Sequence, residues 1–318
     1  MTFQGFSGRM AGKQPKMPRE VDMERILETV PNFSEGRDPE VIEAIAECFR
    51  GKPGVKLLDY SADKDHHRSV FTAVGEPDAL RDAVIKAIGV AVARIDLTRH
   101  QGQHPRMGAA DVVPFIPIRN CSLEDADRVA KEVGDAVARR FGQPVFLYER
   151  SATKPNRENL SDIRKGGFEG MAEKMKDPAW TPDFGPATIH PTGGVTAVGA
   201  RMPLIAFNVN LGTDKLEIAS AIAKKVRHSN GGFRYVKAMG VMLEERRLAQ
   251  VSMNLTDYTQ TSVYRVFETV RMEAERYGVS VVGSELIGLS PLKALMDCAE
   301  HYLRLEHFSL EQVLETRY

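Results

Sequence analysis

Residues 38–50 read Asp-Pro-Glu-Val-Ile-Glu-Ala-Ile-Ala-Glu-Cys-Phe-Arg, and residues 215–227 read Lys-Leu-Glu-Ile-Ala-Ser-Ala-Ile-Ala-Lys-Lys-Val-Arg. Both stretches place apolar side chains at helical spacing, and they align without a gap. Because the same helix pattern recurs so far along the chain, the sequence indicates two similarly built units.

The elements expected around each helix follow the order β-α-β-β-α-β. In the first half they are strands at 26–34, 55–61, 68–74 and 112–118, with helices from Asp38 and at 76–95. In the second half they are strands at 204–211, 235–243, 249–255 and 279–287, with helices from Asp214 and at 262–277. This order is that of a ferredoxin-like sandwich. The sequence therefore predicts an α+β fold of two ferredoxin-like α/β-sandwich subdomains.

Pro114 and Pro117 interrupt the expected strand at 112–118, which favours an edge or irregular position for it. Further elements are expected between the two repeats. They are a helix at 123–141 that begins with Ser122-x-x-Asp125, a strand at 144–148, short helices within 156–176 and an irregular loop at 180–194. The expected organisation is a disordered leader at 1–22, a first subdomain at 23–203 and a second at 204–318.

Composition limits the possible partners. The chain has 43 basic and 43 acidic residues among 318, so its net charge attracts neither nucleic acid nor an anionic membrane. Membrane association is not expected, because no apolar run approaches the length of a bilayer span. Its three cysteines form no CxxC pair, which fits a reducing cytoplasm and predicts neither a disulfide framework nor a zinc knuckle.

The segment Gln101–Gly108 contains the strongest candidate for chemistry. His104 directly precedes Pro105, and a proline restricts the residue before it to extended backbone. His104 is therefore expected outside a helix, where its imidazole can take and give protons near neutral pH. An ordinary surface histidine remains the alternative interpretation.

Four charged residues near predicted strand ends could support such a histidine. Asp59 and Asp111 could orient the imidazole or hold a cationic substrate, although both also suit a cap or a turn. Arg106 and Arg201 could bind carboxylates through their guanidinium forks. All four are also common as ordinary solvated side chains.

Other chemistries receive less support from the motifs. His100 and His104 are four residues apart, but Gly102 and Pro105 disfavour the helix that a metal pair would need. His66 and His67 would point apart in a strand. No metal site is therefore expected. The chain also lacks a phosphate-binding glycine loop and a GxSxG nucleophile elbow.

Several motifs together resemble those of the glutamate formiminotransferase family, the transferase part of the formiminotransferase-cyclodeaminases. They are Val30–Gly36 (VPNFSEG), Gly102–Pro117, Pro182–Pro186, Val198–Arg201, Ala206–Asn210, Ala249–Asn254 and Val282–Leu295. The chain is too short to include the helical cyclodeaminase part as well. The resemblance implies a substrate cleft between the two subdomains and a homodimer.

The resemblance also implies a reaction, namely transfer of the formimino group from N-formimino-L-glutamate to N5 of tetrahydrofolate in histidine degradation. Tetrahydrofolate would be a co-substrate, possibly polyglutamylated. His104 would be the catalytic base and acid. The folate loop would consist of Gly185, Pro186, Ala187, Thr188, Ile189, His190, Pro191, Thr192, Gly193 and Gly194. Formyl transfer between folate and glutamate, and a ferredoxin-like binding module without catalysis, remain alternatives.

Overall fold

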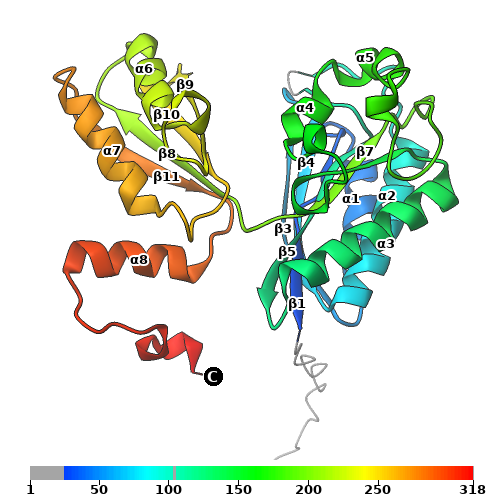
Figure 1. Cartoon of the computed structure of the whole chain (residues 1–318), viewed down its shortest axis with the longest axis horizontal. Coiled ribbons are helices and arrows are strands. Elements are labelled where there is room, and N and C mark those ends of the chain that lie inside the picture. Colours follow the sequence, from blue (N-terminus) through cyan, green and yellow to red (C-terminus); the bar gives the residue numbers. More distant parts are fainter. Residues whose placement is uncertain (1–24, 103–104, 318) are drawn as a thin grey trace, which may run out of the picture. The chain divides into compact units, whose positions relative to one another are not determined.

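The computed structural model describes residues 25–102 and 105–317 and has a mixed α+β architecture with two sheets. Within these residues the chain forms two compact units. The first contains the chain up to residue 121 together with 128–198, and the second contains 122–127 together with 199–318. Figure 1 shows that each unit is built around its own sheet.

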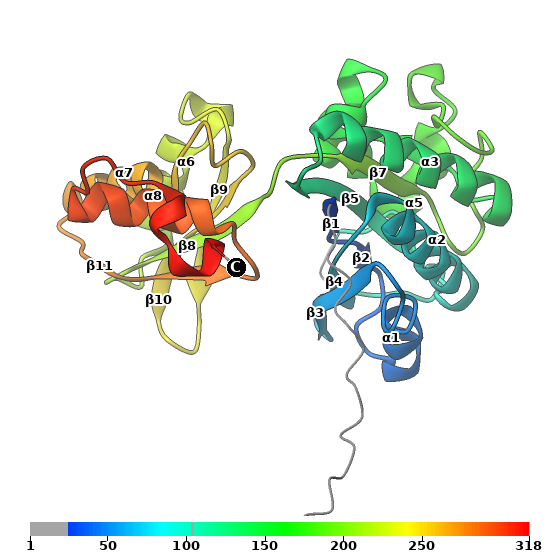
Figure 2. The same ribbon diagram turned by 90° about the horizontal axis from the view of Figure 1, so that it is seen from below.

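The first unit contains a seven-stranded sheet. Its order is β1-β4-β2-β5-β7-β6, and β3 pairs with β4 outside this path. The strands are β1 (Ile26–Thr29), β2 (Asn32–Phe33), β3 (Val55–Asp63), β4 (Arg68–Gly75), β5 (Ala110–Arg119), β6 (Val145–Leu147) and β7 (Thr196–Ala200). Its longer helices are α1 (Pro39–Ala46), α2 (Pro77–Arg94) and α3 (Leu123–Phe141), and Figures 1 and 2 both show them on one side of the sheet.

Alternation along β4 explains where the core of this unit lies. Every second residue of β4 is buried, and Phe71 among them meets the ring of Phe33 edge-on at 5.5 Å between centroids. The rings of Phe49 and Tyr60 stack on Phe71 as well. This aromatic cluster fixes α1 against the sheet, because Phe49 follows directly after that helix.

The helix ends follow local chemistry. Asp38 caps α1, because its carboxylate accepts the backbone N–H groups of Glu40 and Val41. Ser122 and Asp125 form the reciprocal cap predicted for α3, with each backbone N–H donating to the other side chain. Pro77 begins α2, as its fixed φ favours.

The second unit contains a four-stranded antiparallel sheet in the order β11-β8-β10-β9. Its elements are β8 (Ile205–Leu211), α6 (Leu216–Val226), β9 (Val236–Leu243), β10 (Leu248–Leu255), α7 (Val263–Glu275) and β11 (Val281–Ile287). Helices α6 and α7 share one core with alternate residues of β8 and β10, so they cover the same face of the sheet. Helix α8 (Leu292–Leu303) follows β11.

The two aligned helices begin at matching positions. Helix α1 begins at Pro39 and α6 at Leu216, which the gapless alignment pairs. Residues 41, 42, 45 and 46 of α1 are buried, and so are their aligned partners 218, 219, 222 and 223. The repeated pattern therefore marks the same buried face in both units.

Two strands differ from simple expectation and one was not anticipated. The strand expected at 26–34 is divided into β1 and β2 by Val30 and Pro31. Of the edge or irregular position expected for β5, the structure has the irregular one: β5 lies inside the sheet, and its pairing with β1 and β2 shifts in register. Strand β7 was not anticipated, because its small, wholly buried residues show no alternation.

Among the described residues, none of the helices combines the length and the apolar composition needed to cross a bilayer.

Candidate functional site

Two of the motifs found in the sequence meet at the start of β5. The backbone N–H of Ser34, in the VPNFSEG motif, donates to the carbonyl of Ala109 at 2.9 Å. The Ser34 hydroxyl donates to the carbonyl of Gly108 at 2.8 Å and is itself buried. The Val30–Gly36 segment is thereby fixed against the chain that follows His104.

The predicted folate loop meets the same segment from the other side. The N–H of Ala109 donates to the carbonyl of Gly193, and the N–H of Val195 donates to the carbonyl of Met107, each at 2.9 Å. An isolated antiparallel β-bridge pairs Gly108 with Gly194. The structure therefore places the end of the Gly185–Gly194 loop directly beside the Met107–Ala110 segment.

Glycine is required at this contact because the two backbones approach closely. A Cβ on Gly108 would lie 2.0 Å from the carbonyl oxygen of Val195. A Cβ on Gly194 would lie 2.1 Å from the carbonyl oxygen of Met107, and Gly194 also has a φ of +68°. These glycines have a packing role that their sequence motif did not reveal.

Within the loop, the residues from Gly185 to Thr188 are exposed, while Gly193 and Gly194 are buried. The buried Gln143 amide donates to the carbonyl of Gly193 at 2.9 Å. His190 Nδ1 accepts the N–H of Gly193 at 2.9 Å, and burial lowers the pKa of His190. The loop thus has a fixed base and an open first half that can meet a ligand.

Asp111 is a buried anchor of this segment. One carboxylate oxygen accepts the backbone N–H of Met107 at 2.7 Å, and the other accepts Arg164 Nη2 at 2.6 Å. Arg164 comes from the end of α4 (Leu160–Arg164). A buried carboxylate needs such a charged partner to offset its lost hydration. In this arrangement Asp111 orients backbone, and both of its oxygens are engaged.

Arg106 is also engaged. Its Nη1 and Nη2 donate to the two carboxylate oxygens of Glu169 at 3.0 and 2.8 Å, and its Nε donates to His100 Nδ1 at 3.0 Å. The Arg106 hydrogen bond lowers the pKa of Glu169, which lies on α5 (Gly167–Lys174). The guanidinium therefore ties α5 to the chain beside His100.

His100 and His67 lie ring on ring, with 4.0 Å between centroids and 7° between planes. His100 Nε2 lies 2.9 Å from the carbonyl of His67, so His100 donates there and accepts from Arg106 as a neutral ring. Burial lowers the pKa of His100, which agrees with this neutral form. His67 Nε2 lies 3.1 Å from Glu35 Oε1.

The remaining predicted site residues lie elsewhere. His104 lies outside the described residues. Asp59 is exposed on β3, opposite Thr72 of β4. Arg201 follows β7, and its Nη1 donates to the carbonyl of Met202 at 2.9 Å. Among the described residues, no three metal-ligating side chains are grouped to hold an ion.

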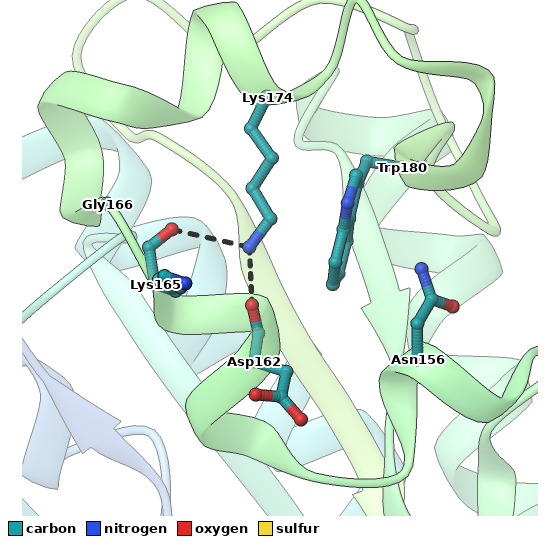
Figure 3. A pocket seen from close by; sticks show the side chains of 6 residues that line it. All are labelled: Asn156, Asp162, Lys165, Gly166, Lys174 and Trp180. Carbon is teal, nitrogen blue, oxygen red and sulfur yellow. Dashed lines mark hydrogen bonds between the residues drawn. The ribbon is translucent and has the colours of Figure 1, made fainter.

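A pocket of about 550 Å³ opens beside α4 and α5. It is lined by Asn156, Asp162, Lys165, Gly166, Lys174 and Trp180. Figure 3 shows the Lys174 ammonium between backbone carbonyls and the Trp180 ring. The ammonium thus has hydrogen-bond and ring partners within the protein.

Five residues of this site were missed as site residues by sequence reasoning: Glu35, His67, His100, Arg164 and Glu169. His66 and His67 were expected to point apart in a strand, but they lie in the turn between β3 and β4. His66 Nδ1 there lies 2.8 Å from Asp63, while His67 faces Glu35. Glu35 lies inside the VPNFSEG motif, which was the one signal that could have drawn attention to it.

Comparison with known families identifies the class of protein. Residues 26–201 match the family described as the formiminotransferase domain, N-terminal subdomain. Residues 206–316 match the formiminotransferase domain family. Because these two matches cover most of the chain, it belongs to the formiminotransferase family.

Individual relatives agree. The chain is 53% identical to "Glutamate formimidoyltransferase" of Streptococcus pyogenes serotype M1, over 92% of this chain and 98% of that protein. It is 42% identical to the protein of the same name from Thermoplasma acidophilum, over 92% of this chain and 97% of that protein. It is 43% identical to "Formimidoyltransferase-cyclodeaminase" of Dictyostelium discoideum, covering 93% of this chain but 56% of that longer protein.

Proposed function

We propose that this chain transfers the formimino group from N-formimino-L-glutamate to N5 of tetrahydrofolate, giving 5-formimino-tetrahydrofolate and glutamate. The observation that carries the proposal is the 53% identity to a glutamate formimidoyltransferase over nearly the full length of both chains. The meeting of the Val30–Gly36 motif and the Gly185–Gly194 loop beside Met107–Ala110 supports it.

The reaction needs a group that first accepts a proton and then donates one. N5 of tetrahydrofolate attacks the formimino carbon, a bond forms, and N5 loses its proton. The bond from that carbon to the glutamate nitrogen then breaks, and this nitrogen gains a proton. We propose that His104 takes the first proton and gives the second, as a neutral imidazole can do.

The charged side chains predicted for the site suggest roles in orienting the chain or in binding the substrates. Arg106 already binds Glu169, and Asp111 already binds Arg164 and Met107, so we propose orienting roles for both. Arg201 makes one side-chain hydrogen bond in the described part of the chain, and we propose that its remaining donors bind a substrate carboxylate. For Asp59, an exposed carboxylate, we propose attraction of the cationic formimino group.

The open half of the Gly185–Gly194 loop is the proposed folate contact, for a co-substrate with or without a polyglutamate tail. We further propose that both units are ferredoxin-like, with subdomains at 23–203 and 204–318 and the substrates in a cleft between them. The β-α-β-β-α-β order of the second unit and its strand order support this assignment. A cytoplasmic homodimer that acts in histidine degradation without a metal completes the proposal.

The test is an assay with tetrahydrofolate and N-formimino-L-glutamate that follows 5-formimino- or 5,10-methenyl-tetrahydrofolate. We expect turnover by the wild type and a kcat lower by roughly 10²–10⁴-fold in His104→Ala, with folate binding retained. His228→Ala, at a surface site of the second unit, is the matched control. If tetrahydrofolate were converted with N-formyl-glutamate but not with N-formimino-L-glutamate as the donor, formyl transfer would be favoured. Near wild-type activity of His104→Ala would exclude His104 as the base.

A further inference from the structure

The segment from His100 to Arg106 is attached to the rest of the first unit on both sides of His104. Gly102 packs so closely on the β3–β4 turn that a Cβ would lie 2.5 Å from the carbonyl oxygen of His66. His67 Nδ1 lies 3.2 Å from the carbonyl oxygen of Gln101. Beyond His104, Arg106 is held by Glu169 and by the carbonyl of His100. The turn containing His67 therefore supports one end of this segment.

Both ring nitrogens of His67 face a hydrogen-bond acceptor. Its Nε2 faces the carboxylate of Glu35 and its Nδ1 faces the carbonyl of Gln101, and both partners can only accept. A neutral imidazole donates through one nitrogen, so it can satisfy one of these acceptors. The imidazolium satisfies both. The His67 and Glu35 side chains are 12% and 13% exposed, so water competes weakly for these bonds.

Glu35 is itself held in place. Its Oε1 also accepts the backbone N–H groups of Arg37 and Asp38, at 2.8 and 3.0 Å. On the other face of His67 lies the neutral ring of His100, which carries no charge to oppose the imidazolium. The charged and titratable groups around His67 are Glu35, His100, Arg106 beyond His100, and His66 with Asp63 in the same turn.

We propose that His67, bound to Glu35 through Nε2 and to the Gln101 carbonyl through Nδ1, is a positioning residue for the chain that leads into His104. It links the VPNFSEG motif to the carbonyl of Gln101. The inference rests on the proposed function for the role of His104, but the linkage itself can be measured without turnover. A side chain that keeps only one of these two contacts holds the chain at Gln101 less firmly.

The first experiment measures the linkage directly. Amide hydrogen exchange at one pH is compared for peptides spanning 95–108 in the wild type, His67→Gln, Glu35→Gln and the control His66→Gln. We expect exchange several-fold faster than wild type in the first two variants, and wild-type exchange in His66→Gln, whose side chain is exposed and bonded to Asp63. Equal exchange in all four proteins would overturn the proposal, whatever the enzyme's activity.

The second experiment measures kcat and KM separately. In His67→Gln we expect kcat lower by about ten-fold with KM changed little, because the chain leading into His104 loses a support that binds no substrate. His66→Gln should keep both constants of the wild type. A wild-type kcat in His67→Gln would contradict a positioning role. An inactive wild type with the exchange differences intact would refute the proposed function only.

Discussion

Lys174 donates hydrogen bonds to the carbonyl groups at the end of α4, which have no donors within the helix. Its Nζ donates to the carbonyls of Asp162, Ile163 and Lys165, the last two at 2.7 and 3.3 Å. Carbonyls at the end of a helix lack partners within the helix, so a lysine from α5 stabilises that end. The ammonium also lies 3.8 Å from the centroid of Trp180.

Because Trp180 is the chain's single tryptophan, its fluorescence reports on Lys174. Burial lowers the pKa of Lys174 to about 8 from 10.5 in the unfolded chain. We expect the fluorescence to change as Lys174 loses its proton near pH 8, and this transition to be absent in Lys174→Met. Lys165→Met, at an exposed position lining the same pocket, should retain it.

The same pKa shift has a defined consequence for stability. The folded-state pKa is depressed, so the contribution of Lys174 is fully present above 10.5 and is lost as the pH falls through about 8. Between these values the free energy of unfolding should rise with pH more steeply in the wild type than in Lys174→Met. The difference in free energy of unfolding between the wild type and Lys174→Met should therefore grow in favour of the wild type between about pH 8 and 10.5. The same difference at both pH values in urea unfolding would contradict this shift.

At the level of elements, β5 and β7 are joined where Gly108 and Gly194 lie side by side. Gly194 and Gly51 offer a matched comparison, because both have positive φ, +68° and +61°. A Cβ on Gly51 would meet nothing within 4 Å, whereas one on Gly194 would meet the carbonyl oxygen of Met107 at 2.1 Å. Comparing alanine substitutions at the two positions therefore separates the cost of backbone strain from the cost of steric overlap.

We expect Gly51→Ala to cost about 1 kcal/mol, the strain of an L-residue at positive φ. Gly194→Ala should cost several-fold more, because either the loop or the Met107 carbonyl must move. It should also raise the KM for tetrahydrofolate more than it lowers kcat. Urea unfolding and steady-state kinetics test both points, and equal costs at the two glycines would show that the close contact is not maintained.

The elements differed in how far sequence could locate them. Helix α3 begins and ends at the predicted residues, since its cap and apolar period are local signals. For β5 the prolines indicated an edge or irregular position without deciding between them, and the structure has the irregular one, because shifts in register with β1 and β2 accommodate prolines inside a sheet. Strand β7 has five buried residues, several of them small, and no polar face to reveal it.

The candidate site was harder to predict than the fold for a related reason. Glu35 meets His67, and Glu169 meets Arg106, only through tertiary structure, because each pair is far apart in the chain. A pattern search sees a histidine pair at 66–67 but cannot show that one ring faces a carboxylate from another segment. Arg106 and Asp111, by contrast, were singled out from position alone, and the structure shows Arg106 hydrogen-bonded to Glu169 and Asp111 to the backbone of Met107.

At the scale of the whole molecule, the proposed cleft requires folate to contact both units. Hydrogen exchange read by mass spectrometry can assign protection to each of them. With tetrahydrofolate at a hundred times its Kd, we expect slower exchange in the Gly185–Gly194 loop of the first unit and in β8 and β10 of the second. Such an excess of ligand stabilises the folded protein by about 2.7 kcal/mol, which corresponds to a roughly hundred-fold lower exchange rate of the slowest amides.

His104→Ala serves as the control for this experiment, because it removes the proposed base and leaves the binding surfaces intact. It should show the same protection as the wild type while its turnover is lost. Protection confined to the first unit would place folate on the Gly185–Gly194 loop alone and refute the cleft. Because each unit has its own core, protection in both units is expected only from a ligand that contacts both.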